Sequence, residues 1–131
     1  QGFYSASKFA VEGLMESLRA EVKPYGIQVV LIEPGDFHTE FTANRRKTRA
    51  AELGTVYAPR FAKALGVMEA DETHGPSPEQ IGDLLERIIT NKSPRLRYTV
   101  GPVSEKLAAG LKKMLPPGLF EWAIMMYYQL L

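Results

Sequence analysis

The sequence predicts an α/β fold with a parallel sheet at its core. Helical and strand patterns alternate along the 131 residues in the order helix, strand, helices, strand, helices, which favours right-handed crossovers between parallel strands. The strand pattern at residues 27–33 is apolar and β-branched nearly throughout, as is typical of a strand covered on both faces. Because two strands alone are too few for a stable parallel sheet, we expect further strands upstream of this sequence.

An amphipathic helix is predicted over residues 5–23. Its apolar residues recur at spacings of three and four, with charged residues between them. Pro24 and Gly26 end this helix, and Pro34 and Gly35 end the strand that follows it. The apolar positions of the helix are Val11, Leu14, Met15, Leu18 and Val22.

The middle of the chain is predicted to hold two helices and a loop. Residues 39–54 are expected to form a helix carrying a basic run, which we interpret as a solvated face in preference to an anion site. A second helix is expected over residues 55–70, around Pro59, and a loop rich in Gly and Pro over residues 73–78.

The segment that begins at Ser77 predicts a further helix. Ser77 is a candidate N-cap, and Pro78 in the first turn supports a helix that runs to about Asn91. A short strand is expected over residues 95–100, and two helices divided by the Pro-Pro-Gly run at 116–118 complete the chain. The apolar face of the Ser77 helix is Ile81, Leu84, Leu85, Ile88 and Ile89.

Composition excludes several classes of function. The formal net charge is +1, so we expect no nucleic-acid partner. The chain has no cysteine, and its two histidines, His38 and His74, are far apart, so we expect neither disulfides nor a metal site. No signal-peptide pattern is present, and no apolar run approaches the roughly 18 residues that span a bilayer. We therefore expect a cytoplasmic protein.

The candidate chemistry lies in Tyr4 and Lys8. Residues four apart on a helix share one face. A free phenol titrates near about 10 and is a poor acid or base at neutral pH, whereas a neighbouring ammonium group favours the phenolate. Tyr4 is therefore a candidate proton donor or acceptor for a hydroxyl or carbonyl substrate. On spacing alone, an ordinary surface pair remains the alternative.

A specific order of motifs follows this pair. An apolar strand comes after the helix, and Pro34-Gly35 then precedes Thr39 by four residues. In this order and at these distances, the segment from Gly2 to Thr42 closely resembles the short-chain dehydrogenase/reductase family. The resemblance implies a Rossmann-like doubly wound parallel sheet with extra C-terminal helices. It also implies hydride transfer between NAD or NADP and a small-molecule carbonyl or secondary alcohol.

The resemblance implies a role for each member of the pair. Tyr4 is the general acid/base at the substrate oxygen, and Lys8 supports the phenolate and holds the nicotinamide ribose hydroxyls. In the family an orienting Ser lies before the Tyr and an Asn lies further upstream, and this sequence contains neither position. Ser5 and Ser7 follow Tyr4, so we assign them to helix initiation and packing.

The resemblance also implies cofactor contacts in the turn after the strand. Pro34 and Gly35 lie where ligands bind in open α/β sheets, and a glycine lets the backbone approach a cofactor closely. The family uses the backbone at the Phe37 position to hold the nicotinamide carboxamide, and the hydroxyl at the Thr39 position to bond the cofactor. Thr39 is equally a candidate N-cap for the helix predicted after it.

The usual pyrophosphate-binding device, a Gly-rich turn between strand and helix, does not occur in this sequence. We therefore expect residues 1–131 to be the C-terminal portion of one Rossmann-type dehydrogenase domain. By itself the chain is expected to bind no dinucleotide tightly. The helix over residues 5–23 commonly pairs with its symmetry mate in this family, so we expect a homo-oligomer.

Residues 39–76 resemble the variable substrate loop of the family. Five apolar residues in it either line a pocket or pack in the core. Residues 102–131 are a helical tail, unusually apolar from 119 onward, which lies on a membrane surface, covers the substrate pocket or packs in an oligomer. The five residues of the loop are Phe41, Tyr57, Phe61, Leu65 and Met68.

Two rival hypotheses come from other functional classes. The first is a non-catalytic fragment or interaction module that kept the helix pattern. The second is a protein that associates peripherally with membranes and whose apolar tail is its working part. The choice between NAD and NADP stays open, because the discriminating residue of such folds lies upstream.

Overall fold

The computed structural model of this chain describes residues 2–48 and 54–131. The chain divides into two compact units. One comprises residues 1–34 and 81–100, and the other comprises residues 35–80 and 101–131.

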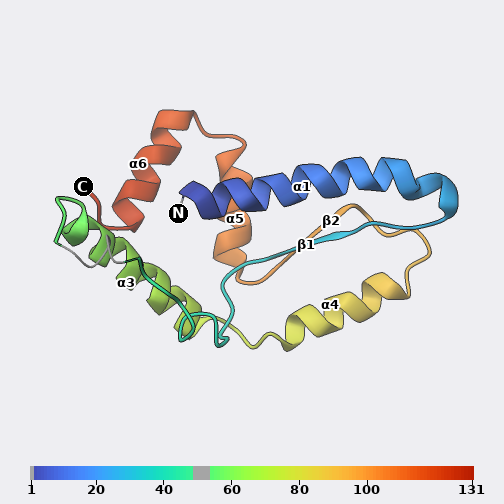
Figure 1. Cartoon of the computed structure of the whole chain (residues 1–131), viewed down its shortest axis with the longest axis horizontal. Helices are drawn as coiled ribbons and strands as arrows, with labels where there is room; N and C mark the ends of the chain where they lie inside the picture. The colour runs from blue at the N-terminus through green and yellow to red at the C-terminus, as the bar shows by residue number, and fades with distance from the viewer. Residues whose placement is uncertain (1, 49–53) are drawn as a thin grey trace. The chain divides into compact units, whose positions relative to one another are not determined.

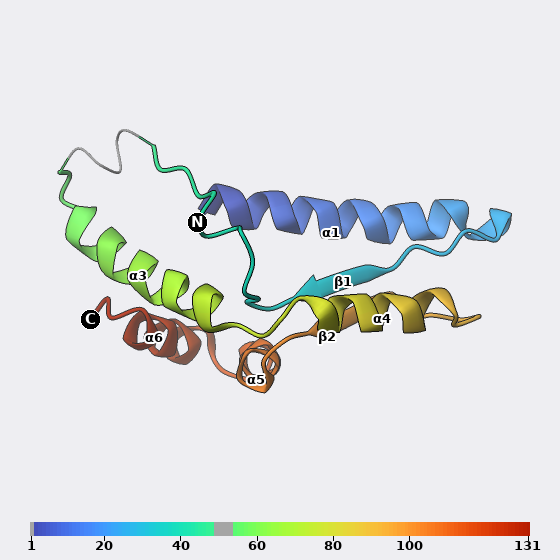
Figure 2. The same cartoon turned by 90° about the horizontal axis from the view of Figure 1, so that it is seen from below.

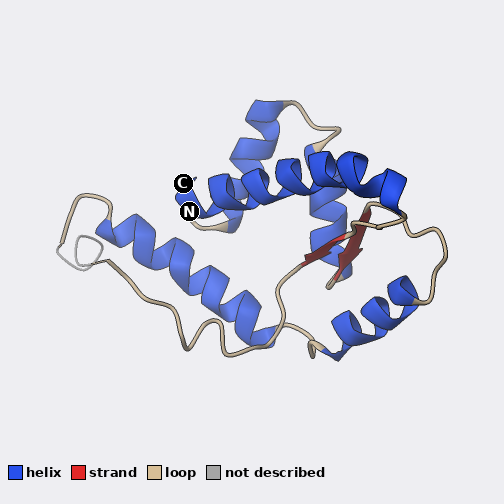
Figure 3. Ribbon diagram, turned by 45° about the vertical axis from the view of Figure 1, so that its right-hand side comes forward, coloured by secondary structure: helices blue, strands red, loops and turns tan. Residues whose placement is uncertain are grey.

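Two short parallel strands form the sheet of the first unit. β1 (Leu31–Pro34) pairs with β2 (Arg97–Val100), and Leu31 lies opposite Arg97. Figure 3 shows the two strands side by side in red. The α/β class with parallel strands that the sequence predicted is thus confirmed.

The helices of the first unit flank these strands. Figure 1 shows the strands between α1 (Gly2–Val22) and α4 (Glu79–Ile89), and in Figure 2 β1 lies between the same two helices. Along α1, Met15, Leu18 and Val22 are half-buried, whereas the predicted apolar positions Val11 and Leu14 are exposed. The amphipathic helix predicted over residues 5–23 is confirmed, with only part of its apolar stripe covered in this unit.

Helix α1 ends as its sequence predicts. A short 3-10 turn, η1 (Lys23–Tyr25), contains Pro24 and is closed by Gly26. The Gly26 backbone has φ of 73° and donates its N–H to the Lys23 carbonyl at 3.1 Å, a left-handed conformation that glycine adopts at little cost.

The start of α4 and the inner face of that helix follow the prediction. The Ser77 hydroxyl accepts a hydrogen bond from the Glu79 amide at 3.3 Å, as expected of a capping residue. Leu84 and Ile88 are buried, so they form the face that α4 turns to the interior. The helix stops at Ile89, two residues before the predicted end.

Both strands are shorter than predicted. Residues 27–30 and 95–96 are not strand, and side chains hydrogen-bond to backbone carbonyls in and near these stretches. Arg19 donates to the Val29 carbonyl at 2.5 Å, and Gln28 donates to the Lys92 carbonyl at 2.9 Å. Pro34, predicted to break the strand, is instead its last residue, which is a position that a proline tolerates.

One arginine ties α1 to the two strands. The Arg97 guanidinium on β2 contacts Glu12 at 3.0 Å, Glu33 at 2.8 Å and also Glu16. Hydrogen bonds to Glu33 and then Glu16 raise the pKa of Arg97 further above its usual range. The cluster therefore fixes the register of α1 on the strands, although exposed ion pairs of this kind contribute little stability.

Three helices make up the second unit. They are α3 (Ala58–His74), α5 (Val103–Lys112) and α6 (Pro117–Tyr127). Figure 1 shows α5 and α6 joined by a short loop and running in opposite directions. The two predicted C-terminal helices are confirmed, and Pro117 is the first residue of α6 rather than part of the break, as suits a proline at a helix start.

The helix predicted over residues 39–54 is wrong over its described part. Residues 39–44 form turns and residues 45–48 are irregular, while residues 49–53 lie outside the described part of the chain. Polar side chains cause this result by competing for backbone groups. The Thr39 hydroxyl accepts the Phe41 amide at 3.2 Å, and the Asn44 side chain donates to the Glu40 carbonyl at 2.8 Å.

Helix α3 begins three residues later than predicted and runs four residues further. Its last turn keeps two side chains bonded to carbonyls one turn back. Thr73 donates its hydroxyl to the Glu69 carbonyl at 2.6 Å, and Nδ1 of His74 lies 2.7 Å from the Ala70 carbonyl oxygen. The predicted loop at residues 73–78 therefore begins only at Gly75.

Across the described ranges, no helix combines the length and the apolar character that crossing a membrane requires.

Candidate functional site

The predicted Tyr4 and Lys8 pair lies in the first two turns of α1. The Lys8 ammonium nitrogen lies 5.2 Å from the centroid of the Tyr4 ring, within cation–π distance. Tyr4 is 53% exposed. The Ser7 hydroxyl donates to the Tyr4 carbonyl at 2.7 Å, which is a local helix contact and matches the packing role predicted for that serine.

The turn after β1 is held by a carboxylate from α5. The Asp36 amide donates to Oε2 of Glu105 at 2.9 Å. A Cβ on Gly35 would overlap the same carboxylate, and a Cβ on Gly101, whose φ is 133°, would come within 3.1 Å of the Gly35 nitrogen. Two glycines are therefore needed for this close approach of the backbone segments.

Phe37 anchors the turn in the interior of the second unit. Its side chain is only 7% exposed. The loop after α3 packs on the same backbone, since a Cβ on Gly75 would lie 2.6 Å from the Asp36 carbonyl oxygen and 2.9 Å from the Phe37 Cα. The His38 amide donates to the Pro76 carbonyl at 3.1 Å, so the loop also hydrogen-bonds this segment.

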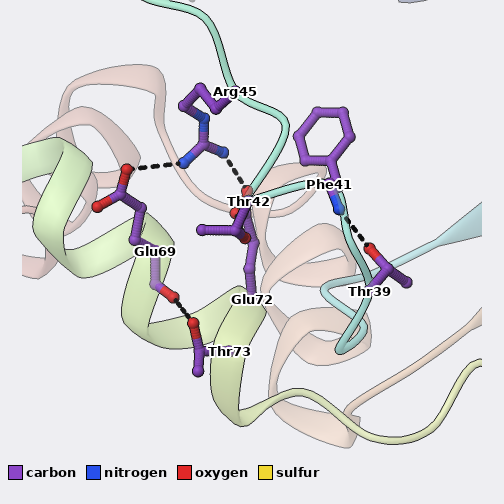
Figure 4. A network of polar contacts seen from close by, with 7 residues as sticks. All are labelled: Thr39, Phe41, Thr42, Arg45, Glu69, Glu72 and Thr73. Carbon is purple, nitrogen blue, oxygen red and sulfur yellow. Dashed lines mark hydrogen bonds and ion pairs between the residues drawn. The ribbon is translucent and has the colours of Figure 1, made fainter.

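The residues after the turn are fixed to α3 by a polar network. Arg45 pairs with Glu69 at 3.3 Å and with Glu72 at 2.5 Å, and Glu72 also accepts the Thr42 hydroxyl. Figure 4 shows these side chains converging on α3, with Thr39 apart from them. Of the basic run that the sequence predicted to be solvated, Arg45 is thus partly buried and paired. Arg46 and Lys47 are exposed as predicted, and Arg49 lies outside the described residues.

The Thr39 hydroxyl caps no helix. It closes a two-residue turn by accepting the Phe41 amide, because the helix predicted after it does not form over residues 39–48. Its predicted contact with a cofactor remains a prediction.

A cavity of about 410 Å³ lies within the second unit, between α5, α6, the end of α3 and the turn at Asp36. Sequence reasoning missed it. None of the five apolar loop residues predicted to line a pocket or pack in the core lines this cavity. Of those five, Leu65 is buried in the core, while Phe41, Tyr57 and Phe61 are exposed.

Three groups that line this cavity, Asp36, Tyr127 and Tyr128, have raised pKa values. Burial, followed by the carboxylates of Glu105, Glu72 and Asp71, raises the pKa of Asp36 from its usual 3.8, and Arg45 opposes this rise. The Tyr127 hydroxyl donates to Asp71 at 2.7 Å, and this bond is the main cause that raises the pKa of Tyr127 to about 12. Burial is the main cause of the raised pKa of Tyr128.

The predicted site residues fall into two groups. Tyr4, Lys8 and Pro34 belong to the first unit, and the structure brings Tyr4 and Lys8 together on α1. Gly35, Phe37 and Thr39 belong to the second. Among the described residues, no group of His, Asp or Glu side chains is arranged to hold a metal ion.

Comparison with known proteins agrees with the motif order. The family model described as short chain dehydrogenase matches residues 1–50. The 3-ketodihydrosphingosine reductase of Bacteroides thetaiotaomicron is 41% identical over 128 residues, which is 98% of this chain and 48% of that protein. The chain belongs to the short-chain dehydrogenase/reductase family. The resemblance predicted from the residues between Gly2 and Thr42 is thereby confirmed.

Other members of the short-chain dehydrogenase/reductase family are similar over most of this chain. The NADPH-dependent 3-dehydrocapnine reductase of Ornithobacterium rhinotracheale is 35% identical over 101 residues, 77% of this chain and 36% of that protein. The 17-beta-hydroxysteroid dehydrogenase type 6 of Mus musculus is 31% identical over 111 residues, 76% of this chain and 35% of that protein. The chain spans less than half the length of these relatives.

Residues of this chain fit the nicotinamide cofactor that the family uses. Tyr4 and Lys8 are both exposed, so the phenol and the ammonium group are accessible to ribose hydroxyls. The turn from Gly35 to Phe37 offers backbone groups at a point where no side chain fits on Gly35.

Proposed function

We propose that this chain supplies the proton-transfer and nicotinamide-holding residues of an NAD(P)-dependent oxidoreductase. The protein would move hydride between the cofactor and a carbonyl or secondary alcohol. The observation that supports this proposal is the contact of Tyr4 with Lys8. The Lys8 ammonium nitrogen lies 5.2 Å from the Tyr4 ring centroid, within the segment that matches the family model. A cofactor of this class supplies the hydride chemistry, and the protein supplies position and the proton.

Each residue then has a distinct task. The Tyr4 hydroxyl gives its proton to the carbonyl oxygen during reduction and takes it back during oxidation. The Lys8 ammonium stabilises the charged phenolate left behind and donates to the ribose hydroxyls. The rigid turn at Gly35 and Phe37 holds the nicotinamide by its backbone. We further propose that these residues form the C-terminal portion of a Rossmann-type dehydrogenase domain, since the relatives are about twice as long or longer.

The substrate is proposed from the names of the relatives. The relative with 41% identity is named for 3-ketodihydrosphingosine, and others are named for 17-beta-hydroxysteroids and retinol. We therefore propose that the substrate is a ketone of the same class as 3-ketodihydrosphingosine. The test is steady-state turnover by the full-length protein on these three compounds with NADH, NADPH and their oxidised forms.

Two substitutions in the full-length protein test the assignment of the pair. Tyr4→Phe keeps the ring and removes the hydroxyl, so kcat should fall by about 10²–10⁴-fold, the usual contribution of a general acid or base, with cofactor affinity nearly unchanged. Lys8→Ala should lower both kcat and cofactor affinity. Tyr25→Phe and Lys23→Ala, on the exposed turn η1, are the matched controls. Near-normal turnover by Tyr4→Phe would show that the pair is an ordinary helix contact.

A second candidate, peripheral membrane contact, is favoured by one observation. Leu119, Trp122 and Met126 of α6 are each about half exposed, at 49%, 53% and 53%, although the opposite face of that helix lines the cavity. We propose that these side chains insert into a lipid surface. Trp122→Gln should reduce sedimentation with anionic vesicles and leave turnover unchanged, whereas undiminished sedimentation would refute membrane contact.

A further inference from the structure

One stripe of α1 carries four polar side chains at intervals of four residues. They are Tyr4, Lys8, Glu12 and Glu16. Because residues four apart on a helix are neighbours on its surface, the Lys8 ammonium has two partners within reach. One is the Tyr4 phenol, one turn before it, and the other is the Glu12 carboxylate, one turn after it. Since a Lys and a Glu at this spacing commonly form an ion pair, spacing alone does not decide between them.

The structure gives Lys8 only the first of these partners. The Lys8 nitrogen lies 5.2 Å from the Tyr4 ring centroid. Glu12 instead contacts the guanidinium of Arg97, on β2, at 3.0 Å. Across the described residues, no carboxylate forms an ion pair with Lys8. The carboxylate that would compete with Tyr4 is thus held by a residue 85 positions later in the chain.

Arg97 holds more than one carboxylate because its guanidinium is a rigid fork of N–H donors. Nη1 contacts Glu12 at 3.0 Å and Glu33 at 2.8 Å, and Nη2 contacts Glu16. The four side chains are between 34% and 50% exposed. Ion pairs at this exposure add little stability, so the main effect of Arg97 is on where the charges lie.

We propose that Arg97 is a positioning residue that holds the Glu12 carboxylate away from Lys8, so that the Lys8 ammonium stays beside the Tyr4 ring. A Glu12 carboxylate paired with Lys8 would compete with the phenolate, and with the ribose hydroxyls of a cofactor, for the same ammonium group. The inference deepens the proposed function, and it rests on that function only where Lys8 is assigned to the cofactor.

The charges along α1 indicate where each carboxylate would move without Arg97. Removal of the guanidinium leaves neighbouring carboxylates that repel one another. Glu16 has Arg19 one turn further along the helix. The cation one turn from Glu12 is Lys8. Glu12 would therefore pair with Lys8, whereas Glu16 lies about 12 Å along the helix from Lys8 and would not.

Acetylation of Lys8 in the cofactor-free, full-length protein tests this arrangement. The reagent is N-hydroxysuccinimidyl acetate, and mass spectrometry of the peptide that contains Lys8 gives the rate. Only the neutral amine reacts, and a paired carboxylate disfavours that form. Arg97→Gln should therefore slow the acetylation of Lys8 by about fivefold, the factor that corresponds to a solvent-exposed ion pair at about 4 Å.

A second substitution identifies the carboxylate responsible. Glu12→Gln in the Arg97→Gln background should restore the wild-type rate, whereas Glu16→Gln in that background should not. Glu12→Gln alone should change the rate by less than about twofold, because Arg97 already holds that carboxylate. Arg95→Gln is the matched control and should leave the rate unchanged, because the exposed Arg95 guanidinium lies 5.0 Å from the Tyr98 ring centroid rather than in the cluster.

Several results would overturn the inference. One is an unchanged acetylation rate in Arg97→Gln, and another is recovery with Glu16→Gln in place of Glu12→Gln. If Arg97→Gln does not unfold cooperatively in urea, the single variant Glu12→Gln decides. Faster acetylation in that variant, by about fivefold, would show that Glu12 already acts on Lys8 and would overturn the inference, whereas an unchanged rate would support it.

Cofactor titration separates this inference from the proposed function. If Lys8 also holds the ribose, Arg97→Gln should raise the cofactor Kd by about fivefold, and Glu12→Gln should restore it. Slowed and rescued acetylation with an unchanged Kd would support the inference and refute the assignment of Lys8 to the cofactor. A Kd that rises in Lys8→Ala, while Arg97→Gln changes neither Kd nor acetylation, would overturn the inference and leave the function standing.

Discussion

Substitution of Gly75 by alanine tests whether close packing of the loop after α3 holds the turn at Asp36 and Phe37. Gly75 has φ of −61° and ψ of 160°, which any residue adopts, so backbone strain does not enter. The added Cβ would lie 2.6 Å from the Asp36 carbonyl oxygen and 2.9 Å from the Phe37 Cα. These are backbone atoms that no side-chain rotation can move away.

The magnitude follows from this geometry. Real Cβ contacts are not found at such distances, so the two segments must separate, and overpacking of this kind costs about 1–3 kcal/mol. The turn is also fixed on its other side by Glu105 and by Phe37. We expect the free energy of unfolding to fall by that amount, and the cofactor KM to rise because the turn is proposed to hold the nicotinamide.

Urea denaturation and cofactor titration of the full-length protein provide the measurement. Gly66→Ala is the matched control, because Gly66 lies within α3 of the same unit and a Cβ there meets nothing within 4 Å. Alanine in a helix interior should stabilise by up to about 1 kcal/mol. A Gly75→Ala protein that is as stable as the wild type, or more stable, would refute the packing argument.

Two other predictions concern Asp36 and the oligomer. Asp36 has a folded pKa above its unfolded 3.8, so its charged form destabilises the fold at neutral pH and this cost is relieved as the pH falls through the folded pKa. Asp36→Asn should therefore be most stabilising, relative to wild type, near about pH 7 and less so near about pH 4, and a difference in urea denaturation that grows on acidification would contradict it. We expect the oligomer to form through α1. Leu14→Arg should yield smaller species in sedimentation, because Leu14 is exposed whereas Leu18 packs in the unit. An unchanged mass would count against this interface.

Patterns within one helix were predictable from the sequence. The helix at α1 and its stop at Pro24 and Gly26 follow from local spacing and backbone chemistry. The start of α4 follows from Ser77 in the same way. The contact of Tyr4 with Lys8 is likewise a local, four-residue relation. All these features depend on residues that are neighbours in the chain.

Features that join distant residues were not predictable. Residues 39–48 do not form the predicted helix, and Arg45 in this segment is fixed to Glu72, 27 residues later, by a contact that no local pattern shows. The cavity joins Asp36, Asp71 and Tyr127, and no local pattern shows that they meet. The pairing that sets the short length of β1 requires a partner strand more than sixty residues away.

The bond between Glu105 and the Asp36 amide has a thermodynamic consequence. One carboxylate both steadies the turn beside Gly35 and lines the cavity, so any molecule that changes its position in the cavity also changes the free energy of the turn. Linkage requires this effect to be reciprocal. Occupancy of the cavity and occupancy of the turn would then each alter the affinity of the other by the same factor, making cofactor and ligand cooperative or antagonistic through a single side chain.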